Sequence, residues 1–200
     1  MLRQFTSIAA LAGWLLIPLL SGCGSLPGTP TPDIPAQAEN DYRRALASMK
    51  KGKHDLALKQ FTALTKKYPQ LAGAHANLGL LHLKDNRVDQ AEQSLQKATQ
   101  LNPNNAIAQN YLGIVYRRQG KFTEAKTAYL AALQADKDYA YAHLNLGILY
   151  DLYLFDLQNA IKHYQQYQDM TESKDKTVEK WLLDLKRRGT AENKQGGKKG

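Results

Sequence analysis

Small and apolar side chains recur at helical spacing along most of the chain, in a pattern that repeats every thirty-four residues. A Leu-Gly pair marks each repeat and stands at Leu78-Gly79, Leu112-Gly113 and Leu146-Gly147. A ring follows each of these leucines by four residues, at His82, Tyr116 and Tyr150. Apolar residues three and four apart form one face of a helix. The pattern therefore predicts helical hairpins, which bury their apolar faces only by stacking on one another.

Each predicted hairpin carries small residues where its two helices would cross. They are Gly79, Gly113 and Gly147 in the first helices and Ala91, Ala125 and Ala160 in the second. Glycine inside a helix costs about 1 kcal/mol relative to alanine, so its recurrence indicates helices packed too closely to admit a Cβ. Asn86 and Gly120 suit the turns between paired helices, because both tolerate a positive φ. Pro69 and Pro103 are placed to end second helices.

These residues at this period resemble the tetratricopeptide repeat (TPR) family, whose unit is a helix–turn–helix. The resemblance implies an all-α fold, a right-handed superhelix of about four TPR helical hairpins within residues 38–174. The expected repeats are residues 38–71, 72–105, 106–139 and 140–174. Two positions depart from the family pattern: Arg44 stands where leucine is preferred, and Ala160 follows Tyr150 by ten residues instead of nine. The fourth turn is therefore expected to carry one extra residue.

A further amphipathic helix is predicted over residues 175–188. Val178, Trp181, Leu182 and Leu185 form one apolar stripe at helical spacing. A repeat array needs a terminal cover with a polar outer face, so this segment is interpreted as a C-terminal capping helix. Residues 189–200 are rich in glycine and lysine and are expected to be disordered.

The first twenty-two residues have the pattern of an export signal. Arg3 precedes an apolar run from Ile8 to Leu20. A membrane-spanning helix needs about 20 apolar residues, and this run is shorter and is interrupted by Gly13 and Pro18. A processed signal peptide over residues 1–22 is therefore the better interpretation.

The end of this signal, Leu20 to Cys23, resembles the lipobox of bacterial lipoproteins. The resemblance implies cleavage before Cys23 and covalent lipid on its sulfur, with no other cofactor. The alternative is ordinary cleavage at small residues beside a chance cysteine. Cys23 is the only cysteine, so it has no intramolecular disulfide partner, and an exported lone thiol favours lipidation. Two or three acyl chains would hold the protein stably on a membrane.

Residues 23–37 contain four prolines and are predicted to form an extended spacer after the lipid. By resemblance to enterobacterial lipoproteins, Gly24 after the cysteine favours the outer membrane, with the protein facing the periplasm. In a bacterium with one membrane, the anchor would lie in the cell membrane. The formal net charge is +9, but the excess gathers near the C-terminus, so nucleic acid is not expected as a partner.

No sequence motif of an enzyme is present: the chain lacks G-x-S-x-G, H-E-x-x-H, a P-loop and a dinucleotide fingerprint. No catalytic activity is therefore predicted. His75 and His143 share a repeat position two units apart, so their rings should lie on the order of 20 Å apart. Zinc ligands lie about 2 Å from the ion. No metal site is predicted, and these histidines are interpreted as structural.

The TPR resemblance implies a peptide-binding groove along the first helices of the hairpins. The implied lining residues are Ala76, Leu80, Leu83, Lys84, Asn110, Ile114, Arg117, Arg118, Tyr141, Leu144, Ile148, Asp151 and Leu152. This surface is apolar with a basic spot, which favours an apolar or mildly acidic peptide, or a helix laid in the groove. The alternative is that the aliphatic members pack between neighbouring hairpins.

The segment Leu152 to Leu157 is unusually apolar for a turn. Exposed apolar residues of this kind often mark a binding site. The alternative, which we favour from the sequence, is that the segment packs beneath the C-terminal helix against Trp181, since a large aromatic residue in a cap needs a partner.

Together these features predict a membrane-anchored TPR scaffold that binds protein partners in the periplasm. Short TPR lipoproteins of this plan resemble the pilotins of type IV pili, and also adaptors that recruit cell-wall hydrolases. A scaffold that helps to assemble an envelope machine, such as a pilus or a secretion system, is the first hypothesis. The alternative is a cell-wall or membrane tether that acts through its basic tail. The identity of the partner and the oligomeric state are left open.

Overall fold

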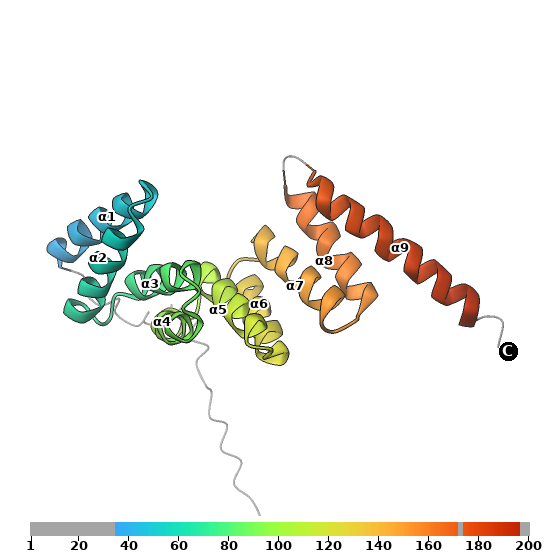
Figure 1. Ribbon diagram of the computed structural model, residues 1–200, viewed down its shortest axis with the longest axis horizontal. Helices are drawn as coiled ribbons and strands as arrows, with labels where there is room; N and C mark the ends of the chain where they lie inside the picture. Colours follow the sequence, from blue (N-terminus) through green and yellow to red (C-terminus); the bar gives the residue numbers. More distant parts are fainter. Residues whose placement is uncertain (1–34, 172–173, 197–200) are drawn as a thin grey trace, which may run out of the picture. The chain divides into compact units, whose positions relative to one another are not determined.

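The computed structural model describes residues 35–171 and 174–196. The predicted signal peptide, Cys23 and most of the spacer lie outside these residues. Within these residues the secondary structure is nine α-helices (Figure 1). They are α1 (Ala36–Lys50), α2 (His54–Lys67), α3 (Ala72–Lys84), α4 (Val88–Leu101), α5 (Ala106–Arg118), α6 (Phe122–Ala135), α7 (Ala140–Leu152), α8 (Leu157–Met170) and α9 (Lys176–Gly196). None of these helices combines the length and apolar character needed to span a membrane.

The first eight helices pair in chain order into four antiparallel hairpins. Each second helix also packs against the first helix of the next hairpin, and α5 contacts both α3 and α7 directly. Figure 1 shows this succession from α1–α2 to α7–α8, with α9 against α8. The predicted all-α stack of four hairpins followed by a terminal helix is confirmed.

The turns within the hairpins have the backbone that the sequence predicts. Asn86 and Gly120 have φ of 58° and 76°, and Gly52 has φ of 71° in the first hairpin. Each lies two residues before the second helix of its hairpin. In the fourth hairpin this place is taken by Phe155, with φ of 54°. The extra residue expected in the fourth turn therefore lies before Phe155, and an aromatic residue adopts the left-handed conformation.

Side chains from the second helices fill the space beside the repeated glycines. A Cβ built on Gly113 would lie 2.5 Å from Cε1 of Tyr129, and one on Gly79 would lie 2.6 Å from Cγ of Leu95. Tyr164 meets Gly147 in the same way. Leu95, Tyr129 and Tyr164 are almost completely buried, as are Ala91, Ala125 and Ala160. The second, third and fourth hairpins are thus each closed by a large residue on the second helix that packs against a glycine of the first.

Neighbouring hairpins are also joined by hydrogen bonds between their first helices. Asn77 Nδ2 donates to the Tyr42 hydroxyl at 2.9 Å, and Asn145 Nδ2 donates to Asn110 Oδ1 at 2.9 Å. Both bonds link residues thirty-five apart, one more than the repeat period. Asn77 and Asn145 therefore share one repeat position, and Tyr42 and Asn110 share the position before it. Gly73 leaves room for the Tyr42 hydroxyl, which would lie only 2.8 Å from a Cβ there.

The C-terminal helix is longer than predicted. We expected it to end at Arg188 and residues 189–200 to be disordered, but α9 runs to Gly196, so that expectation is wrong for residues 189–196. The stretch Ala191 to Gln195 is rich in good helix formers, and they extend the helix past Gly189. Thr190 also donates its hydroxyl to the Arg187 carbonyl at 2.8 Å.

Candidate functional site

The predicted groove residues lie on α3, α5 and α7, and they divide by exposure. Leu83 is 6% exposed and Asn110 is 2% exposed. These two pack between hairpins and do not line an accessible surface, which corrects their assignment to the groove. Tyr141 and Leu152 are 59% and 58% exposed. The others are half-buried or exposed and remain available: Ala76, Leu80, Lys84, Ile114, Arg117, Arg118, Leu144, Ile148 and Asp151.

The basic spot of the groove is held in two different ways. Arg117 Nε donates to the Tyr129 hydroxyl at 3.3 Å, and its guanidinium lies 5.9 Å from the centre of the Tyr153 ring. Arg117 is therefore fixed by the hairpin core beneath it. Arg118 is exposed, with Nη1 donating to the Leu83 carbonyl at 3.5 Å, and Lys84 is exposed one unit earlier. These two cations face solvent.

Two exposed residues belong to this surface but are missing from the sequence prediction. Lys50 ends α1 at the position that Lys84 and Arg118 hold in the next two units, and it is exposed. Ile107 is 55% exposed at the start of α5, thirty-four residues before Tyr141. The repeat spacing alone could have found both.

Tyrosines gather at the other end of α7. The ring centres of Tyr139 and Tyr141 lie 6.2 Å apart, and those of Tyr141 and Tyr167 lie 6.4 Å apart. Burial, with Tyr111 nearby, raises the pKa of Tyr139 to about 12. Tyr139 is therefore uncharged at neutral pH, and the cluster presents ring surface at the exposed Tyr141.

The Leu152 to Leu157 segment is partly packed and partly exposed. The Tyr153 ring lies 4.7 Å from the Phe122 ring, centre to centre, and Leu157 is half-buried against the core. Phe155, in contrast, is 79% exposed. Trp181 packs on Tyr164, with ring centres 5.5 Å apart. The interpretation that the whole segment packs beneath α9 is therefore wrong for Phe155.

Phe155 combines this exposure with an unfavourable backbone. A side chain in the left-handed region brings Cβ close to the following carbonyl and costs about 1–2 kcal/mol. Glycine or asparagine takes this place in the other three turns. A strained residue of this kind is characteristic of ligand-binding and switch regions.

A pocket of about 530 Å³ opens beside Phe155, and we call it the C-terminal pocket. Its lining residues are Ile148, Asp151, Leu152, Phe155, Tyr164, Trp181, Asp184 and Arg188. Arg188 pairs with both lining carboxylates: its Nη2 lies 2.8 Å from Asp151 Oδ1, and its Nε lies 3.1 Å from Asp184 Oδ2. Arg187, which does not line the pocket, supplies the second positive charge, with Nη2 3.0 Å from Asp184 Oδ1. The pocket therefore offers aromatic and aliphatic walls with a neutralised rim.

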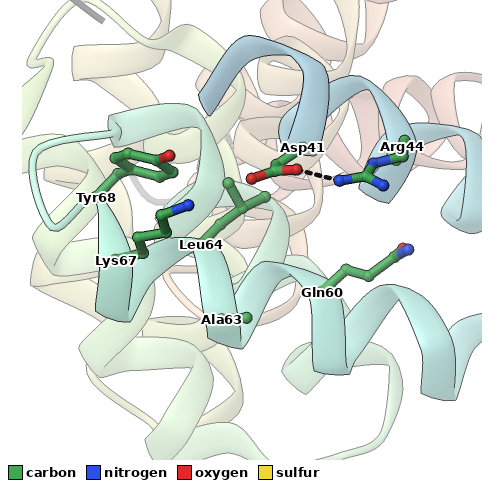
Figure 2. A pocket seen from close by; sticks show the side chains of 7 residues that line it. All are labelled: Asp41, Arg44, Gln60, Ala63, Leu64, Lys67 and Tyr68. Atoms are coloured by element: carbon green, nitrogen blue, oxygen red, sulfur yellow. Dashed lines mark hydrogen bonds and ion pairs between the residues drawn. The ribbon is translucent and has the colours of Figure 1, made fainter. Parts of the chain in front are cut away.

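A second cleft, of about 290 Å³, lies between α1 and α2 (Figure 2). Asp41 and Arg44 form an ion pair at its mouth, and the Lys67 ammonium lies 5.1 Å from the centre of the Tyr68 ring. In later units the position of Arg44 holds leucines that pack against the preceding hairpin. No described helix precedes α1, which explains the charged residue there.

The histidines that the sequence singles out act in the structure as bridging groups. The His75 Nε2–H donates to the Pro69 carbonyl at 3.0 Å, and Gln109 makes the equivalent bond to Pro103 at 3.2 Å. His143 is buried and its Nδ1 lies 2.9 Å from Nδ1 of His163. Among the described residues, no three histidine, cysteine or acidic side chains converge as a metal site.

Comparison with protein-family models identifies the repeat. Tetratricopeptide repeat models match residues 42–106 and 94–127, and a TPR repeat model matches residues 113–151. The chain is a TPR protein. The matched residues span α1 to α7, so the hairpins described above are TPR units. No curated protein sequence matches the chain.

Solved structures share the fold of this TPR protein at low sequence identity. MamA residues 41–end from Desulfovibrio magneticus RS-1 superposes with a TM-score of 0.66 at 18% identity, covering 78% of this chain and 86% of MamA. Pseudomonas aeruginosa PilF superposes with a TM-score of 0.67 at 21% identity, covering 79% and 72%. The first TPR of Spaghetti (RPAP3), solved with the HSP90 peptide SRMEEVD, reaches 0.56 at 21% identity, covering 60% and 94%. At these identities the likeness concerns the fold alone.

Proposed function

We propose that this TPR protein is a membrane-anchored scaffold that binds protein partners along α3, α5 and α7. The observation that carries the proposal is the run of accessible apolar and cationic side chains at equivalent positions of successive first helices, among them Lys84, Arg118 and Tyr141. Buried charged groups and catalytic constellations are not needed for such a role. A peptide or helix laid across several units contacts one set of side chains in each.

The envelope setting of the proposal comes from Cys23. A lipid on this residue would hold the scaffold at the outer membrane, facing the periplasm, and the Pro-rich spacer would separate the repeats from the bilayer. In that setting a protein-binding scaffold would help to assemble an envelope machine such as a type IV pilus or a secretion system. PilF of Pseudomonas aeruginosa, whose solved structure is similar in fold, makes the pilus the first machine to examine.

Charge reversal on the groove should abolish partner capture. We expect Tyr141→Ala combined with Lys84→Glu and Arg118→Glu to reduce crosslinked partner recovered from envelopes by roughly tenfold or more, because interface energy concentrates in a few aromatic and cationic side chains. All three side chains are exposed, so the melting temperature should change little. The measurement is quantitative mass spectrometry of proteins that co-purify after crosslinking.

Lys59→Glu with Lys66→Glu supplies the matched control for this experiment. Both lysines are exposed on α2, away from the first helices of the later units, so partner recovery should equal that of the wild-type chain. If the wild-type chain recovers no protein above the background of an unrelated lipoprotein, the scaffold proposal is wrong.

Replacing Cys23 with alanine should release the protein from membranes. The described residues contain no spanning helix, and a chain without its acyl groups loses about 0.8 kcal/mol for each CH₂ that was buried in the bilayer. After fractionation by sedimentation, the wild type should be found in the membrane pellet and the Cys23→Ala variant in the periplasmic extract. Continued sedimentation of Cys23→Ala with membranes would instead require a second anchor.

A further inference from the structure

The C-terminal pocket overlaps the groove at the end of α7 and extends beyond it. Three residues of α7 belong to both, namely Ile148, Asp151 and Leu152, whereas Phe155 and Trp181 come from the fourth turn and α9. Leu152 and Phe155 are the most exposed of its apolar residues, at 58% and 79%, and Trp181 is 38% exposed. The pocket is thus an apolar extension of the groove that the cap helps to build.

Phe155 contributes little to the fold that carries it. Its side chain is mostly in solvent, and its backbone takes the left-handed conformation that Gly52, Asn86 and Gly120 adopt in the other turns. Glycine would satisfy that backbone without strain. An aromatic ring kept in a conformation that disfavours it, and not packed in the core, is explained by a contact with another molecule.

Cations lead along the first helices to this pocket. Lys50, Lys84 and Arg118 hold one position in three successive units, and Leu152 holds it in the fourth. All three cations are exposed, and Lys50 and Lys84 make no ion pair with the described residues. Beyond them, Asp151 and Asp184 are balanced by two cations: Arg188 pairs with both carboxylates, and Arg187 pairs with Asp184. A negatively charged partner would meet uncompensated positive charge and then a neutral apolar pocket.

We propose that the partner of this surface is an extended acidic segment that places one aromatic side chain in the C-terminal pocket. The proposal rests on the scaffold function above and specifies the partner's chemistry. Packed helices lie 8–10 Å apart, so the cations should be spaced by roughly 10 Å. An extended chain advances about 3.3 Å per residue, so an acidic residue at every third position would meet Lys50, Lys84 and Arg118 in turn. The aromatic residue follows one step further on.

A designed peptide tests this arrangement directly. The probe is a fluorescein-labelled decapeptide with glutamate at every third position, a terminal phenylalanine, and serine and alanine between them, together with the same sequence in reverse order. Binding to the full mature chain is measured by fluorescence anisotropy at low and high salt. We expect one of the two orders to bind, and its affinity to fall at least tenfold when the phenylalanine is replaced with serine.

Phe155→Gly is the decisive protein variant. The substitution removes the ring and relaxes the backbone, so it should weaken probe binding at least tenfold while leaving the melting temperature unchanged or raised. Lys50→Glu with Lys84→Glu should weaken binding by a similar factor and remove most of its salt dependence. Leu183→Ala is the matched control, because Leu183 is 63% exposed on α9 and does not line the pocket, and it should bind the probe as the wild type does.

The outcomes separate this proposal from the scaffold function. Wild-type affinity in Phe155→Gly would show that the pocket is not the anchor, and failure of both peptide orders to bind would show that the inferred chemistry is wrong. In either case, loss of the crosslinked partner in the groove variant would still support the scaffold. Loss of probe binding in Phe155→Gly without loss of stability supports the pocket. A purely structural role of Phe155 predicts instead a lower melting temperature with probe binding retained.

Discussion

Replacing Gly113 with leucine should lower the free energy of unfolding by about 3 kcal/mol, and replacing it with alanine by about 1–2 kcal/mol. Even the single Cβ of alanine would lie 2.5–3.0 Å from three ring atoms of Tyr129. That ring is completely buried and its hydroxyl bonds Arg117, so it has no open space to enter. Thermal melting should show a fall of several degrees, at about 2–4 °C per kcal/mol for a domain of this size.

The alanine variant is informative because the change improves helix propensity but introduces a clash with Tyr129, and these two effects on stability have opposite signs. Alanine is the better helix former by about 1 kcal/mol, so a glycine kept only by chance would be stabilised by the change. Gly189 provides the matched control: it lies within α9, and a Cβ there would meet only Leu157 Cδ2, at an ordinary 3.7 Å. Gly189→Ala should therefore raise the melting temperature. A rise for Gly113→Ala as well would contradict the close crossing of α5 and α6.

The fold could be predicted from the sequence because the same close packing of two helices recurs in three of the four units. A glycine in the first helix and a large side chain in the second appear three times, so the spacing alone indicates where the two helices of a hairpin cross closely. The positive φ of Asn86 and Gly120 is predictable for the same reason. Periodicity averages over single exceptions, and this is why the predicted stack of hairpins is correct although Arg44 breaks the pattern.

The candidate site was predicted less well, because exposure at a repeat position depends on its particular neighbours. Asn110 has a groove position, yet Asn145 of the next unit bonds it and buries it. Phe155 was expected to pack beneath α9, but Tyr164 already occupies the contact with Trp181. Neither outcome follows from spacing along one chain, since each depends on which of several competing side chains fills a space.

The buried pair His143 and His163 has no counterpart in the other units and makes the fourth hairpin sensitive to pH. Their Nδ1 atoms lie 2.9 Å apart, so one ring donates and the other accepts, and the accepting ring must be neutral. Tyr150 stacks on the other side, with its ring centre 5.6 Å from that of His163. Burial, with the nearby His143 and Lys162, lowers the pKa of His163 to about 4. Burial also lowers the pKa of His143.

Acidification should therefore destabilise the folded chain well above the pH at which carboxylates titrate. Between pH 6.5 and pH 4 the unfolded His163 binds a proton that the folded one does not, so stability is complete above the unfolded pKa of 6.5 and is lost as the pH falls toward 4. From pH 7 to pH 5 this one group should reduce the free energy of unfolding by about 2 kcal/mol. Urea unfolding at several pH values measures how the free energy of unfolding changes with pH.

His163→Phe isolates this contribution, because phenylalanine keeps a flat ring beside Tyr150 but carries no titrating group. Its stability at pH 7 is not the test, since the bond to His143 is also removed. Between pH 7 and pH 5, the free energy of unfolding of His163→Phe should fall by about 2 kcal/mol less than that of the wild type. His54→Gln, which removes an exposed histidine of α2, is the control for the loss of one histidine. A curve for His163→Phe parallel to that of the wild type would mean that His163 takes up its proton as readily in the folded chain as in the unfolded one, and the buried pair would then have no part in the pH dependence.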